Sequence, residues 1–169
     1  MSYTNSSGQP QGIPQTIASK IREALISEII AINGYARHIA NSNMQEVNDV
    51  WKEIMEDEKK HYNMFIDLIR KYDLTEYQLF LRHENDGYIK GTLQEYKPDY
   101  DKQLILNNIR EDIKGESEAI ILYEQLANEL PYQDVIEVLD FVISDEKEHT
   151  EELTALLTIH DSTECKKQH

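Results

Sequence analysis

The chain has 169 residues, of which 40% are hydrophobic and 29% are charged, so we expect one soluble globular domain with a sizeable core. Its formal net charge of −15 opposes phosphate backbones and anionic lipids, which argues against nucleic acid and membrane partners. The single cysteine, Cys165, excludes an internal disulfide and a four-cysteine iron site. No apolar run could span a bilayer and the N-terminus lacks a secretory signal, so a cytoplasmic location is expected.

The first part of the chain predicts two long helices. Residues 1–14 are polar and are expected to form a flexible arm. Apolar residues then recur at three- and four-residue spacing over 17–39, which is the stripe of an amphipathic helix. The polar residues 41–43 are expected to stop this helix and to cap the next one. A second stripe follows over 47–68.

The second part of the chain repeats this plan after an irregular connector. Glycine and proline interrupt the connector, which leaves room for a short helix around 75–83. Two further apolar stripes run over 106–130 and 135–156, and residues 160–169 form a polar tail. Four long helices with a long central link predict an all-α fold over 15–159, a four-helix bundle with one long crossover.

Each of the four stripes is interrupted by polar residues on its core-facing side. These are Glu28, Glu58, His61, Glu116, Glu146 and His149. Burying an isolated carboxylate costs several kcal/mol, and no lysine or arginine on the stripes offsets the cost. A pair of divalent iron or manganese ions would offset it, because carboxylate oxygens and neutral imidazoles are suitable ligands. The known arrangement in bundles is one Glu from each of two helices and Glu-x-x-His from the other two, which matches this set.

A constant shift of 88 residues relates the two halves of the chain. It maps Glu28 to Glu116, Tyr35 to Tyr123, Asp57 to Asp145, Glu58 to Glu146 and His61 to His149. Both halves therefore carry Asp-Glu-Lys-x-His at the same place in their second helix. The pattern indicates an internally duplicated helix pair, in which each copy supplies half of a nearly symmetric dinuclear site.

At these residues the chain resembles the ferritin-like di-iron carboxylate superfamily, especially rubrerythrin-type domains and a tandem fusion of the encapsulated-ferritin helix pair. The resemblance implies a centre of two iron ions, with manganese as the alternative. It implies that Asp57 and Asp145 each accept the ring N–H of the histidine from the opposite half. Tyr35 and Tyr123 are expected in the core with their hydroxyls on ligand carboxylates, and a redox role is the alternative. The remaining histidines (His38, His83, His160, His169) have no matching partners and are expected at the surface.

The function that the resemblance implies is oxidation of Fe(II) by O2 or H2O2, a ferroxidase activity that serves iron storage, iron sequestration or oxidative-stress defence. The protein would work as a homo-oligomer or inside an encapsulating protein shell. A rubrerythrin-like peroxidase and a manganese catalase are alternatives, and a di-iron hydroxylase fits the acidic charge less well. Rubrerythrins usually carry a further metal-facing glutamate where this chain has Ala119, which favours Fe(II) oxidation over peroxidase activity.

Overall fold

The computed structural model describes residues 16–83 and 101–161, and in this part of the chain it shows five helices and no strand. They are α1 (Ile17–Ala40), α2 (Gln45–Tyr72), α3 (Leu74–His83), α4 (Lys102–Glu129) and α5 (Gln133–Asp161). The predicted all-α bundle is therefore confirmed, and the short helix expected near residues 75–83 is α3. The predicted N-terminal arm and most of the connector and of the polar tail lie outside the described residues.

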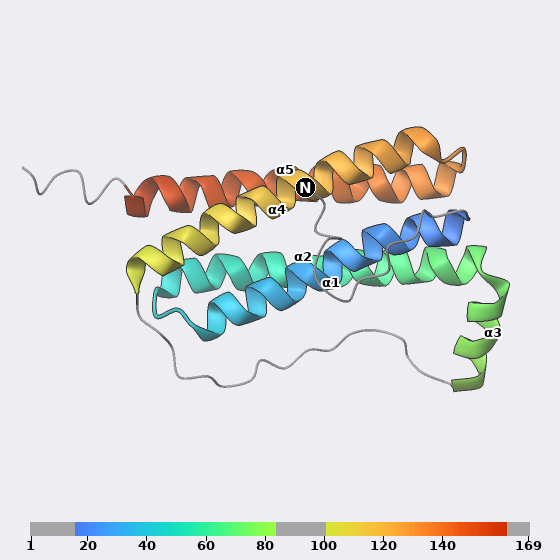
Figure 1. Cartoon of the computed structure of the whole chain (residues 1–169), viewed down its shortest axis with the longest axis horizontal. Coiled ribbons are helices and arrows are strands. Elements are labelled where there is room, and N and C mark those ends of the chain that lie inside the picture. Colours follow the sequence, from blue (N-terminus) through green and yellow to red (C-terminus); the bar gives the residue numbers. More distant parts are fainter. Residues whose placement is uncertain (1–15, 84–100, 162–169) are drawn as a thin grey trace, which may run out of the picture.

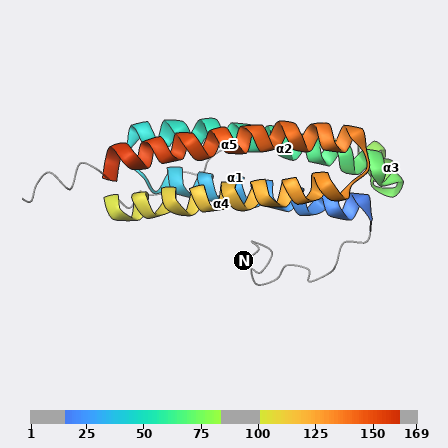
Figure 2. The same cartoon turned by 90° about the horizontal axis from the view of Figure 1, so that it is seen from above.

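The four long helices form two antiparallel hairpins. Helices α1 and α2 make one hairpin and α4 and α5 make the other, and the two lie side by side (Figure 1). Seen from above, α1 and α4 form one layer and α2 and α5 the opposite layer (Figure 2). Helix α2 ends at one end of the bundle and α4 starts at the other (Figure 1), which is the arrangement of a bundle with one long crossover.

The helix boundaries follow local capping, with two differences from the sequence prediction. Thr16 caps α1 by accepting the Ser19 backbone N–H at 3.1 Å. The N-cap of α2 is Met44, which makes no side-chain cap bond, so the expected capping of this helix by residues 41–43 was wrong. Helix α5 continues to Asp161, two residues beyond the predicted end of the bundle.

Two apolar clusters fill the interior, one toward each end of the bundle. One cluster contains Phe65 and Tyr123, whose ring centroids are 5.6 Å apart, and the other contains Tyr35 and Trp51. Burial of each large apolar side chain contributes about 1.5–3 kcal/mol, so these clusters supply most of the driving force for the fold. Along each long helix, the residues of one cluster are separated from those of the other by the polar core positions. The candidate site is thus a polar layer between two apolar layers.

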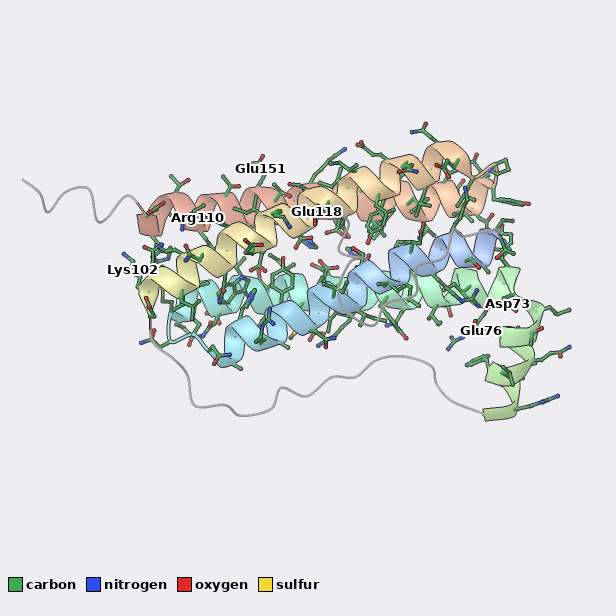
Figure 3. All side chains as sticks on the ribbon, viewed as in Figure 1. Asp73, Glu76, Lys102, Arg110, Glu118 and Glu151 are labelled. Carbon is green, nitrogen blue, oxygen red and sulfur yellow. The ribbon has the colours of Figure 1, made fainter. Side chains whose placement is uncertain are left out.

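Helix α3 extends the α1/α2 hairpin at one end of the bundle. Arg22 of α1 donates to Asp73 at 2.8 Å and also to Glu76, which ties the start of α3 to α1. Figure 3 labels Asp73 and Glu76 at this end of the bundle. The guanidinium of Arg70 lies 3.9 Å from the ring centroid of Phe80. Among the helices described, none is long and apolar enough to cross a membrane.

Candidate metal centre

All six polar core residues predicted from the sequence meet in the middle of the bundle. Each is at most 4% exposed, although carboxylates and imidazoles normally lie at protein surfaces. They form two overlapping groups in which one ligand atom of each residue lies within 4.8 Å of the others. The first group is Glu28, Glu58, His61 and Glu146, and the second is Glu58, Glu116, Glu146 and His149. Glu58 and Glu146 belong to both groups and therefore lie between the two candidate metal positions.

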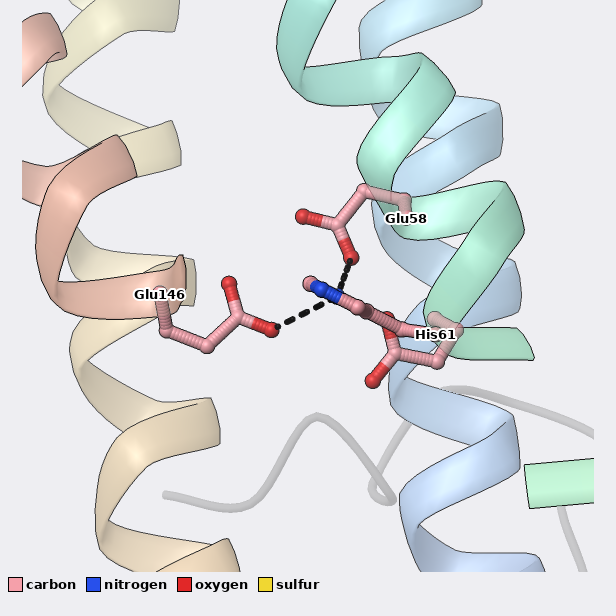
Figure 4. Close-up of side chains that lie close together, drawn as sticks. Glu58, His61 and Glu146 are labelled. Carbon is pink, nitrogen blue, oxygen red and sulfur yellow. Dashed lines mark ion pairs between the residues drawn. The ribbon is translucent and has the colours of Figure 1, made fainter. Parts of the chain in front are cut away.

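Both histidines point their Nδ1 atom into the cluster. His61 Nδ1 lies 3.4 Å from Glu146 Oε1 on α5 and 3.6 Å from Glu58 Oε2 on its own helix α2, and Figure 4 shows both contacts. His149 Nδ1 lies 3.1 Å from Glu146 Oε2 and 3.4 Å from Glu58 Oε1. In each Glu-x-x-His pair the spacing of three residues brings both side chains to one helix face, and the Nδ1 atoms approach the same two carboxylates.

The other nitrogen of each ring faces an aspartate of the opposite half. His61 Nε2 lies 3.1 Å from Asp145 Oδ2, within hydrogen-bonding distance. His149 Nε2 lies 3.8 Å from Asp57 Oδ2, beyond hydrogen-bonding distance. The structure therefore brings both predicted pairs together but makes them unequal. A proton held on Nε2 leaves Nδ1 with a lone pair for a metal ion.

Two buried tyrosines donate hydrogen bonds to Glu28 and Glu116, the two glutamates that are not shared between the groups. The Tyr35 hydroxyl donates to Glu116, and the Tyr123 hydroxyl donates to Glu28, so each tyrosine reaches the glutamate of the other half. Burial and the nearby carboxylates raise the pKa of both phenols well above the ordinary value, so both hydroxyls remain donors. These contacts fix the rotamers of Glu28 and Glu116.

The buried carboxylates of the cluster repel one another, and burial disfavours their charged form. Burial, followed by repulsion from Glu146 and Glu28, raises the pKa of Glu58 well above its ordinary range. Burial and the same kind of repulsion raise the pKa of Glu116. Burial alone would also raise the pKa of Glu146, but a hydrogen bond from His149 and the nearby imidazole of His61 bring it down to about 2. The pKa of each imidazole rises because carboxylates surround it, although burial opposes this.

The donor set fits a pair of divalent metal ions. Three buried atoms of the cluster, Glu28 Oε2, Glu58 Oε1 and His61 Nδ1, make no hydrogen bond within the described part of the chain. Buried polar atoms are normally satisfied, so these three require a partner that protein groups do not supply. Metal ions would satisfy them and neutralise the carboxylates together. The six residues could therefore hold two metal ions.

Comparison with protein families agrees with this geometry. The family model described as Rubrerythrin matches residues 20–157, which include all six residues of the cluster. The chain belongs to the rubrerythrin family. Comparisons with curated proteins and with solved structures gave no match. Membership in this ferritin-like di-iron superfamily, together with the carboxylate and histidine cluster, fits the binding of two iron ions and suggests an oxidoreductase.

A cavity of 480 Å³ lies beside the cluster on the side of α1 and α4. All four glutamates of the cluster line it, as do both tyrosines. Ala119, where the resemblance to rubrerythrins would place a further glutamate, also lines the cavity and adds no carboxylate to it. The histidines lie on the opposite side, towards α2 and α5, so the cavity exposes the carboxylate face of the centre.

One group of residues at this cavity was missed by sequence reasoning. His38 was expected at the surface, but it is 6% exposed, and its Nδ1 lies 3.1 Å from Asp112 Oδ2 on α4. Its ring packs on Trp51 with centroids 5.3 Å apart. Asp112 precedes Glu116 by one turn and so lies on the same helix face. This spacing is the sequence signal that could have placed Asp112 near the cluster. His38 lacked an equivalent in the duplicated half, so the repeat gave no indication.

Proposed function

We propose that this protein is a ferroxidase, which binds two Fe(II) ions and oxidises them with O2 or H2O2. The observation that supports this is the assembly of six ligand groups from four helices into two overlapping sets with shared central carboxylates. Two bound iron ions would supply the electrons that reduce the oxidant. Carboxylates favour the more highly charged oxidised ions, and a site with both carboxylates and imidazoles accommodates each oxidation state.

The protein residues position the metal ions and control their surroundings. Tyr35 and Tyr123 hold Glu116 and Glu28 by hydrogen bonds, while Asp145 orients the ring of His61. The apolar clusters enclose the polar layer toward both ends of the bundle. The cavity between α1 and α4 provides space for a small oxidant next to the carboxylates. These features serve oxidation of iron without requiring an organic substrate.

Anaerobic titration of metal-free protein with Fe(II), followed by oxygen, tests this proposal. We expect saturation at two iron ions per chain and rapid oxygen-dependent appearance of Fe(III) absorbance. Iron that is taken up and oxidised beyond two per chain would favour storage in a larger assembly over catalysis alone. Binding of two manganese ions with release of O2 from peroxide, and no oxidation of Fe(II), would instead support a manganese catalase.

A further inference from the structure

The cavity is one-sided although the metal centre is nearly symmetric. On α4 its lining runs from Asn108 to Tyr123, on both sides of Glu116. On α1 it runs from Ser27 to His38, almost entirely on the C-terminal side of Glu28, where Gly34 and His38 line it together with Asp112 of α4. We call this side the open half. The shift of 88 residues gives the equivalents of these three positions as Leu122, Leu126 and Ala24. These residues belong to, or pack against, the apolar cluster at the other end, so the equivalent space is filled.

Two glycines border the cavity in the middle of long helices. Glycine in a helix interior is unfavourable compared with alanine, so Gly34 and Gly115 call for a structural reason. Close packing is not that reason, because a Cβ atom built on either residue meets nothing within 4 Å. The space in front of them is open. Because Gly34 lines the cavity, a leucine at residue 34 would project into this space. At the equivalent position, 88 residues later, the chain does carry a leucine, Leu122.

The open half leads to one particular group of ligands. Asp112 precedes Glu116 by one turn on α4, and His149 follows Glu146 by one turn on the antiparallel helix α5. Both are therefore displaced toward the same end of the bundle. The group with Glu116 and His149 is consequently the one beside the open half. The His38–Asp112 pair joins α1 to α4 at this end and fixes their separation.

The lining of the open half favours cations. Glu111 and Asp112 line this half, and the four cluster glutamates lie at its inner end, against one arginine in the lining, Arg37. A cleft lined mainly by one sign of charge concentrates ions of the opposite sign. At its inner end lie Glu28 Oε2 and Glu58 Oε1, which are buried and make no hydrogen bond among the described residues. These atoms point to a cation as the species that the cavity admits.

From these observations we infer that divalent metal ions enter the dinuclear centre through the open half, and that Gly34 keeps this entrance clear. The inference rests on the proposed function, since it concerns the route of Fe(II) to the same site. Both metal positions are then loaded from one side, with the position that has His149 reached first. Sequence symmetry alone would have suggested two equivalent routes.

The test is the rate at which metal-free protein binds Co(II), followed by stopped-flow absorbance, in Gly34→Leu and the matched control Gly34→Ala. Both substitutions remove the glycine, but only leucine fills the space. We expect Gly34→Leu to slow both binding phases by about tenfold, while Gly34→Ala stays within about twofold of wild type. Both variants should still bind two Co(II) per chain. Equal rates in the leucine variant and wild type, or equal slowing in both variants, would overturn the inference.

A second arm blocks the entrance after folding. In a Cys165→Ser background, Gly34→Cys is modified by a bulky disulfide-forming thiol reagent and then released by reduction. Slow Co(II) binding that recovers on reduction supports the entrance, and an unaffected rate overturns it. A wild-type protein that fails to bind two metal ions would refute the proposed function itself. Stoichiometric binding with no effect at residue 34 would refute the entrance alone.

Discussion

The stability of the metal-free protein should fall as pH rises, because its centre retains protons that the unfolded chain releases. Burial and mutual repulsion raise the pKa of Glu58 and Glu116 well above the ordinary 4.5. Between 4.5 and the raised value, the folded protein keeps these protons while the unfolded chain loses them. Each such group then lowers the free energy of unfolding by about 1.4 kcal/mol per pH unit.

The other titrating groups of the centre do not reverse this trend. The pKa of His61 and of His149 is raised by the surrounding carboxylates, so the stability that they contribute is full below 6.5 and is lost as pH rises through the folded-state value. Glu146 has a pKa of about 2, so its contribution is present above 4.5 and is lost only as pH falls through about 2. Above about pH 5.5 the net slope is therefore negative until the pH passes the raised folded-state pKa values.

Glu58→Gln isolates one of these groups. The variant cannot titrate at this position, so its stability should fall less steeply than that of the wild type, by about 1.4 kcal/mol per pH unit. Urea denaturation of chelator-treated protein, followed by far-ultraviolet circular dichroism at several pH values, measures both slopes. Glu151→Gln on the exposed side of α5 is the control and should keep the wild-type slope (Figure 3). A flat or rising wild-type profile, or an unchanged slope in Glu58→Gln, would refute the reasoning.

Three further outcomes are expected. Glu58→Ala/Glu146→Ala should remain helical but bind no metal ions, because both shared carboxylates are removed; calorimetric titration that still finds two sites would disprove the ligand assignment. Asp145→Asn should weaken metal affinity by about 10–100-fold, because Asp145 lies 3.1 Å from His61. Asp57→Asn should weaken it less, because Asp57 lies 3.8 Å from His149. Competition with a chelator measures both affinities, and the reverse order would contradict the reasoning. Phe65→Ala should cost about 3–5 kcal/mol in urea denaturation, since this ring is fully buried, and a loss below about 1 kcal/mol would show that the site repacks.

Much of the centre could be predicted from the sequence because helices convert spacing into direction. A carboxylate that interrupts an apolar stripe lies on the core side, as Glu28 and Glu116 do at 1% and 4% exposure. The repeat distance then paired the halves, and the Glu-x-x-His spacing fixed which histidine accompanies which glutamate. These are local relations along a regular helix, and they determined the fold class and the ligand set.

Features that depend on contacts between different helices could be learned only from the tertiary structure. The burial of His38 requires Asp112 from a helix that lies 74 residues away in sequence, and no periodicity reports such a contact. The same holds for the unequal distances from Asp57 and Asp145 to the histidines, which a symmetric repeat does not anticipate. Nor does a symmetric repeat anticipate the cavity, which Gly34 lines while Leu122 at the equivalent position packs against an apolar cluster. Helix faces follow from spacing within one segment, whereas cavities depend on the volumes that separate segments bring together.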